Sequence, residues 1–185
     1  GARMRQNAKF VFKTLDALLG DHAPFLISLS DGLQEELRLV ISAAEVGPAG
    51  GDIPDFDDID EETGKRLREI LAHTRPIEIS EQRAYEIWFP AYILYQIRNE
   101  SFCAFGAEEA CSGKYLMRLE RSRLLSHVSD FTDAQQLKDG TFYPGKWEHY
   151  CIITQCHVID VIAHEPPIVS VSDDKPEAEG LTRPV

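Results

Sequence analysis

The chain has few cysteines and no long apolar segment. Its four cysteines form no Cys-x-x-Cys pair, so we expect free thiols rather than a disulfide framework. No apolar run approaches the roughly 20 residues that a membrane-spanning helix needs, and the first residues lack the pattern of a secretory signal peptide. The sequence therefore predicts a cytoplasmic protein without a membrane segment. The cysteines are Cys103, Cys111, Cys151 and Cys156.

Signatures of common enzymes and cofactor sites are also missing. G-x-S-x-G, H-E-x-x-H and G-x-G-x-x-G do not occur in the sequence. Asp58, Asp60 and Glu62 fit three positions of a calcium-binding loop, but Thr63 stands where that loop needs glycine. On a regular strand His149 and Cys151 would share a face, but two ligands do not make a zinc site. We expect no metal and no cofactor, and the sequence favours a non-enzymatic role.

Basic residues are outnumbered, 19 against 31 acidic ones, which gives a net charge of −12. Between residues 31 and 62, Arg38 is the single basic residue among eleven acidic ones. Acidity keeps many proteins soluble, and it also repels nucleic acid and anionic membranes while attracting basic partners. The eleven are Asp31, Glu35, Glu36, Glu45, Asp52, Asp55, Asp57, Asp58, Asp60, Glu61 and Glu62.

The N-terminal part has the spacing of amphipathic helices. Apolar residues three and four positions apart predict a helix over 4–19, which Gly20 ends. A second helix is expected from Ser30 or Asp31 to Gly47. A third helix is expected over 58–73, with acidic residues in its first turn and basic residues further along, as the helix dipole favours.

From residue 77 onward the pattern is typical of strands. Apolar and polar residues alternate over 77–97, where Pro90 predicts a break or a bulge, and a helix over 81–89 is the alternative. Residues 114–121 predict another strand, and Ser122 is a candidate N-cap of a short helix. The nearly continuous apolar run 147–163 predicts one long strand that is buried on both faces.

Helices followed by strands indicate an α+β fold. We expect one domain over residues 1–171, helical over 4–75, with N-terminal helices packed on a twisted antiparallel β-sheet formed mainly by residues 77–171. Residues 172–185 are polar and predict a disordered tail.

The first functional hypothesis is an acidic protein-interaction domain. Asp55, Asp57, Asp58 and Asp60 would face a basic protein partner, and an aromatic anchor such as Phe56 or Trp88 would supply affinity. An inhibitor or immunity-type protein that masks the basic site of a toxin or nuclease is the class that fits. Tyr143 and Trp147 form a second candidate anchor, although a lid over the core is the commoner role for such residues.

The second hypothesis is a small-molecule-binding domain or enzyme with a polar pocket on the sheet. Arg98 and Glu100 would line it together with Arg118 and Glu120, if their strands are neighbours and helices cover that face. His149 or His157 would serve as general base. The simpler interpretation is ordinary cross-strand ion pairing on a solvent-facing sheet, with Gln96 on the same face.

A homo-oligomer is compatible with either hypothesis. The long C-terminal strand would pair across the interface, because an exposed strand edge must be covered.

Overall fold

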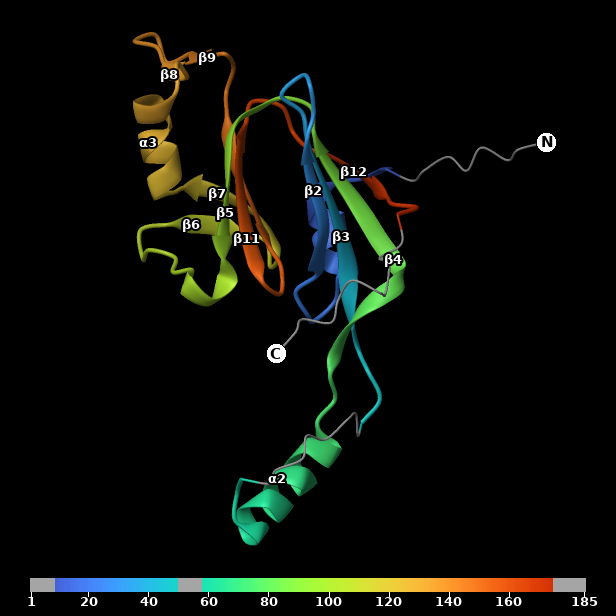
Figure 1. Cartoon of the computed structure of the whole chain (residues 1–185). Helices are drawn as coiled ribbons and strands as arrows, with labels where there is room; N and C mark the ends of the chain where they lie inside the picture. The colour runs from blue at the N-terminus through green and yellow to red at the C-terminus, as the bar shows by residue number, and fades with distance from the viewer. Residues whose placement is uncertain (1–8, 50–57, 175–185) are drawn as a thin grey trace, which may run out of the picture.

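The computed structural model describes residues 9–49 and 58–174, which form two five-stranded antiparallel sheets packed face to face (Figure 1). Sheet A has the order β1-β12-β4-β3-β2 and sheet B the order β5-β11-β10-β7-β6. The strands of sheet A are β1 (Lys9–Phe10), β2 (Phe25–Asp31), β3 (Leu37–Val46), β4 (Ile77–Phe89) and β12 (Ile168–Val171). Those of sheet B are β5 (Tyr92–Asn99), β6 (Ala110–Ser112), β7 (Leu116–Arg121), β10 (Glu148–Ile153) and β11 (His157–Ala163).

The helices take three different positions around this sandwich. α1 (Phe12–Leu18) closes one side between the sheets, since it contacts β7 of sheet B and β12 of sheet A. α3 (Arg123–Phe131) and the small hairpin of β8 (Gln135–Gln136) and β9 (Phe142–Tyr143) lie against the outer face of sheet B (Figure 1). α2 (Glu61–His73) stands clear of the sandwich at the end of the β3–β4 ribbon. A short 3-10 helix, η1 (Glu100–Phe102), follows β5.

The core fills the space between the two sheets. Inward side chains alternate along each strand with outward ones, so β3 contributes Leu37, Leu39 and Ile41 while β11 contributes Ile159 and Val161. Leu15 and Leu19 of the α1 segment join the same cluster and are fully buried. A second apolar layer lies under α3, where Val128, Trp147 and Ile162 are buried. Trp147 is thus part of this buried layer rather than an exposed anchor, whereas Tyr143 is exposed.

The predicted α+β fold holds only in a coarse sense. Strands dominate, and the helices do not form an N-terminal layer on one sheet. The expected helix from Ser30 or Asp31 to Gly47 is wrong, because residues 25–31 and 37–46 are the strands β2 and β3. Residues 39–44 are all buried, so both faces of β3 are largely apolar. Apolar residues therefore also recur three and four positions apart, which is the spacing of an amphipathic helix.

The prediction of a single long strand over 147–163 is also wrong. The run folds back on itself as the hairpin β10–β11, in which Glu148 pairs with Ala163 and Ile153 with Val158. Thr154 closes the turn with both its backbone and its hydroxyl, each donating to the carbonyl of His157 at 2.8 Å. Both strands are internal to sheet B, so the expected pairing of this segment across an oligomer interface has no free edge to use.

Several local predictions are confirmed. The helix expected over 58–73 is α2, strands β4 and β5 meet at a break beside Pro90, and the alternative helix over 81–89 is wrong. The strand expected over 114–121 is β7, and Ser122 is the N-cap of α3. The helix expected over 4–19 is confined to 12–18 in the described part of the chain. The predicted tail beyond residue 174 lies outside the described residues, and among those described no helix is both long and apolar enough to cross a membrane.

Candidate functional site

The polar pocket expected on the sheet does not assemble. β5, which carries Arg98, and β7, which carries Arg118, are separated by β11 and β10 rather than neighbours. Arg118 lies beside the inward-facing Tyr150, whereas Arg98 contacts Asp160 on the outer face of sheet B. Glu100 is exposed in η1 and Glu120 is exposed on β7. The four predicted residues therefore do not form one site.

Gln96 and Arg98 do converge, but on a carboxylate that sequence reasoning did not single out. Asp160 is 1% exposed, and its Oδ2 accepts hydrogen bonds from Gln96 Nε2 and Arg98 Nε, both at 2.9 Å. Its other oxygen lies 2.8 Å from His149 Nε2, and His149 Nδ1 lies 2.7 Å from the Ser122 hydroxyl. A continuous polar chain thus runs from the N-terminus of α3 to the edge strand β5.

This chain contains a serine, a histidine and an aspartate in hydrogen-bonded order, yet its role is structural. Ser122 is 5% exposed, and its oxygen already accepts the N–H of Leu125 as the α3 N-cap. The Ser122 hydroxyl and Asp160 thus engage both ring nitrogens of His149, Nδ1 and Nε2. A nucleophile must reach the atom it attacks, and this hydroxyl is enclosed. His149 is therefore not the general base of an accessible site.

The local charges fix the protonation states around Asp160. Burial alone would raise the pKa of Asp160, but hydrogen bonds from His149 and Gln96 and the nearby positive charges outweigh it and hold the pKa below its ordinary value. Burial, reinforced by the Asp160 charge, raises the pKa of the Cys151 thiol. Cys151 is fully buried, so it is an inert core thiol rather than a nucleophile.

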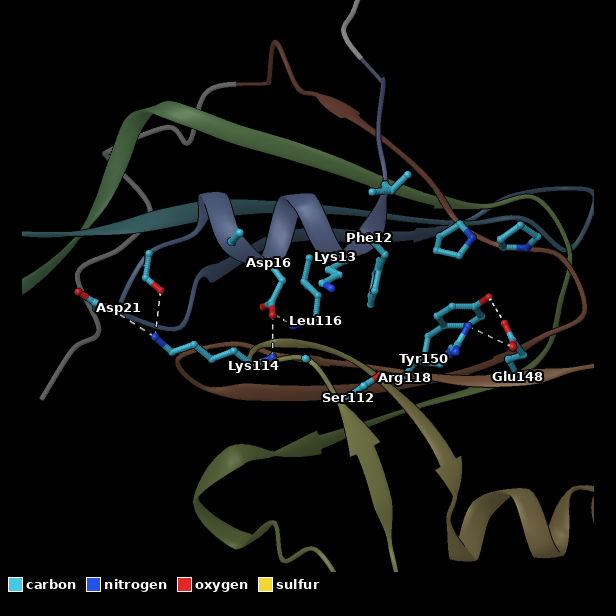
Figure 2. A pocket seen from close by; sticks show the side chains of 16 residues that line it. Phe12, Lys13, Asp16, Asp21, Ser112, Lys114, Leu116, Arg118, Glu148 and Tyr150 are labelled. Atoms are coloured by element: carbon cyan, nitrogen blue, oxygen red, sulfur yellow. Dashed lines mark hydrogen bonds and ion pairs between the residues drawn. The ribbon is translucent and has the colours of Figure 1, made fainter.

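A cavity of about 1010 Å³ opens on the other side of sheet B, between α1 and strands β7 and β10 (Figure 2). Phe12 projects from α1 into the middle of this region, with Lys114 and Asp21 at one end and Arg118, Tyr150 and Glu148 at the other. Arg118 is the one residue of the predicted pocket that lines it.

Asp16 ties the two walls of this cavity together. Its carboxylate accepts the backbone N–H groups of Lys114, Tyr115 and Leu116 at 2.6, 2.7 and 2.9 Å. Leu116 is the first residue of β7 and the other two directly precede it, about a hundred positions away from Asp16 in the sequence, so no local pattern could have revealed the contact. The link holds α1 at a fixed distance from sheet B and sets the shape of the cavity.

A second feature is the α2 arm, which we define as residues 44–49 and 58–79. Gly64 is the only buried residue of α2, and Ile70 is 64% exposed. Local contacts hold the helix: Asp60 Oδ1 accepts the N–H of Thr63 at 3.0 Å, and Arg66 pairs with Glu62 one turn away at 3.5 Å. The helix therefore owes little to tertiary packing.

The base of the arm is fixed to sheet A by polar contacts, of which the one between Ser42 and Ser80 is buried. Ser80 is 1% exposed, and its carbonyl accepts the Ser42 hydroxyl at 2.6 Å. The Ser80 hydroxyl in turn donates to Glu45, which Arg83 also contacts at 3.3 Å. Beyond this point the ribbon continues to the pair Val46–Ile77, and α2 follows.

The predicted acidic residues lie on this arm as far as they are described. Asp58 and Asp60 precede α2 and are exposed. Asp55, Asp57 and the proposed anchor Phe56 lie outside the described residues. Trp88, the other proposed anchor, is part of β4 rather than of the arm, and the guanidinium of Arg38 lies 5.9 Å from its ring.

No group of three or more metal-ligating side chains occurs in the described ranges 9–49 and 58–174. Comparisons of the chain with protein-family models, with curated proteins and with solved structures found no match.

Proposed function

We propose that this protein is an acidic interaction domain that binds a basic protein partner through the α2 arm. The observation that carries the proposal is the position of α2, which extends from the sandwich with nearly all of its surface exposed (Figure 1). A 13-residue helix is marginally stable alone, and most protein helices are stabilised by packing an apolar face. A partner would supply that missing contact.

Exposed apolar side chains along the arm support this function. Ile70 on α2, Ile59 before it, and Val46 and Ile77 on the ribbon are each at least 36% exposed. Half-buried Leu67 and Leu71 lie on the same helix. A few such anchors carry most of the affinity of a typical interface, while the surrounding polar residues set orientation.

The charge of the arm favours a basic partner. The sequence has seven acidic residues and no basic residue between positions 52 and 62. The C-terminal end of α2 is three residues from β4, so its first turn, with Glu61 and Glu62, lies at the end of the helix away from the sandwich (Figure 1). An exposed acidic tip would speed association with a basic surface. An inhibitor or immunity-type protein would use it in this way.

The test is a pull-down from the source cells, followed by reconstitution with the captured protein after purification. The arm variant combines Asp58→Asn, Asp60→Asn, Glu61→Gln and Glu62→Gln; asparagine at position 60 can still cap α2. We expect a one-to-one complex that the arm variant weakens about tenfold or more and that high salt also weakens. Ile70→Ser should weaken the same complex because it removes an anchor.

The matched control removes the same charge elsewhere, by Glu120→Gln, Asp133→Asn, Glu165→Gln and Asp173→Asn, all at exposed positions. This control should retain the partner at low salt. Equal binding by wild type, arm variant and control would reject the arm as the contact surface. Equal loss in both variants would mean that net charge alone attracts the partner, which also contradicts the proposal.

A further inference from the structure

We infer that the cavity between α1 and sheet B binds a small organic acid, that is, an apolar body that carries a single carboxylate. Its volume, about 1010 Å³, is at the upper end of the range for sites of small ligands. α2 contributes no residue to it, so the inference is independent of the proposed protein interaction.

The walls can hold an apolar body. Phe12 and Tyr150 meet edge to face with ring centroids 5.7 Å apart, and Leu116 is buried beside them. Pro166 and Pro167 line the same cavity and offer rigid apolar surface. Ligand sites are usually lined in this way, with mostly apolar and aromatic side chains and a few polar groups that fix orientation.

Arg118 supplies the main carboxylate-binding group. Its Nη1 lies 3.5 Å from Glu148, a long contact in which the arginine side chain is half exposed. Exposed ion pairs of this kind contribute little stability, so the guanidinium can turn to a ligand at small cost. A planar guanidinium matches a carboxylate with two parallel hydrogen bonds. Glu148 would keep its other partner, the Tyr150 hydroxyl, which donates to it at 2.8 Å.

Lys13 supplies a second positive charge at the cavity, on an exposed residue. Among the described residues the other cavity lysine, Lys114, pairs with Asp21 at 3.5 Å, whereas Lys13 has no ion pair. Asp16, the third acidic residue of the lining, is held by backbone N–H groups at both of its oxygens rather than by a lysine. The three basic and three acidic side chains of the lining balance in number, so the preference for a carboxylate rests on Lys13, which has no ion pair in the described part of the chain, and on Arg118, whose ion pair is long and half exposed.

The binding test uses two acids and their matched counterparts. Decanoate and 2-naphthoate represent an aliphatic and an aromatic body; 1-decanol and decyltrimethylammonium keep the decyl chain but remove or reverse the charge. Isothermal titration of the full chain should show one site for at least one acid. The alcohol and the cation should bind about tenfold more weakly or worse, because they lose the charge-assisted hydrogen bonds.

Variants assign that site to the cavity. Arg118→Gln and Lys13→Gln should each weaken binding of the acid about tenfold, whereas Lys138→Gln, which removes an exposed lysine from the β8–β9 turn, should not. Phe12→Leu should weaken the binding of both the acid and the alcohol. The inference is overturned if neither acid binds at about 1 mM, if decanol binds as well as decanoate, or if the three charge variants behave alike.

Discussion

His149 and Asp160 meet diagonally across the β10–β11 hairpin, with the imidazole Nε2 2.8 Å from the carboxylate and both residues less than 3% exposed. The pair connects three parts of the fold, because Asp160 also binds two side chains of β5 and His149 binds the N-cap of α3. A buried carboxylate is tolerated only when such partners satisfy it.

Replacement of Asp160 by asparagine should be strongly destabilising. The variant keeps the size of the side chain but removes the charge that Arg98 and His149 contact. We expect the free energy of unfolding to fall by about 3 kcal/mol or more. Urea denaturation of wild type and variant measures this difference. The control is Arg118→Gln, which removes an exposed ion pair and should change the free energy of unfolding by less than about 1 kcal/mol. A loss as small as that of the control would show that the network contributes little.

The stabilisation from Asp160 should depend on pH in a defined direction. Its native pKa is lowered, so the unfolded chain, with a pKa of about 3.9 at this residue, takes up the proton first as the pH falls. The contribution is therefore fully present above the unfolded pKa and is lost as the pH falls through the lower native pKa. Urea denaturation at pH 7 and at about pH 3 should show the gap between wild type and Asp160→Asn narrowing at the acidic end. A constant gap would contradict this assignment.

Asp16→Ala should loosen α1 from sheet B. Three backbone N–H groups lose their acceptor, and we expect a destabilisation of about 3 kcal/mol, with a smaller loss for Asp16→Asn, which keeps one acceptor oxygen. Hydrogen exchange gives a local readout, because the amides of Lys114, Tyr115 and Leu116 should lose protection first. Unchanged protection at these amides would mean that the carboxylate does not hold the two elements together.

The N-caps of α2 and α3 should respond differently to the same type of change. Asp60→Ala removes about 1 kcal/mol of local stability from a helix with one buried residue, so α2 should fray while the midpoint of thermal unfolding barely moves. Ser122→Ala removes a cap that also binds His149, so it should lower the midpoint of the whole domain. Hydrogen exchange of α2 and calorimetry separate the two effects; an equal fall in midpoint would show that α2 is coupled to the sandwich.

Local signals predicted the elements that local physics determines. Ser122 was visible as the cap of α3 because a capping side chain binds a backbone group three residues away, and the acidic first turn indicated the start of α2, whose cap is Asp60. Pro90 marked the break between β4 and β5, because proline cannot donate a hydrogen bond to a strand neighbour.

The strand β3 was not predicted from the sequence because it is buried on both faces. Val40 and Ser42 are as buried as Leu39 and Ile41, so the alternation that identifies a strand was lost. The turn between β10 and β11 was missed for a related reason. Thr154, Gln155 and Cys156 include no glycine or proline. The hydrogen bonds between Thr154 and His157 close the turn, and contacts with distant carbonyls, such as that of Pro24 to the Gln155 N–H, also hold it.

The sequence by itself determined the charge of the molecule, the side-chain caps of α2 and α3 and the acidic run before α2, because each depends on residue types or on residues a few positions apart. The tertiary structure alone decided which charged residues meet. The order of strands in sheet B brings Arg98 to Asp160 and sends Arg118 to the cavity under α1, and the pairing of β3 with β4 holds α2 away from the sandwich. Strand order and register follow from burying apolar surface across the whole chain, and neighbouring residues do not encode them.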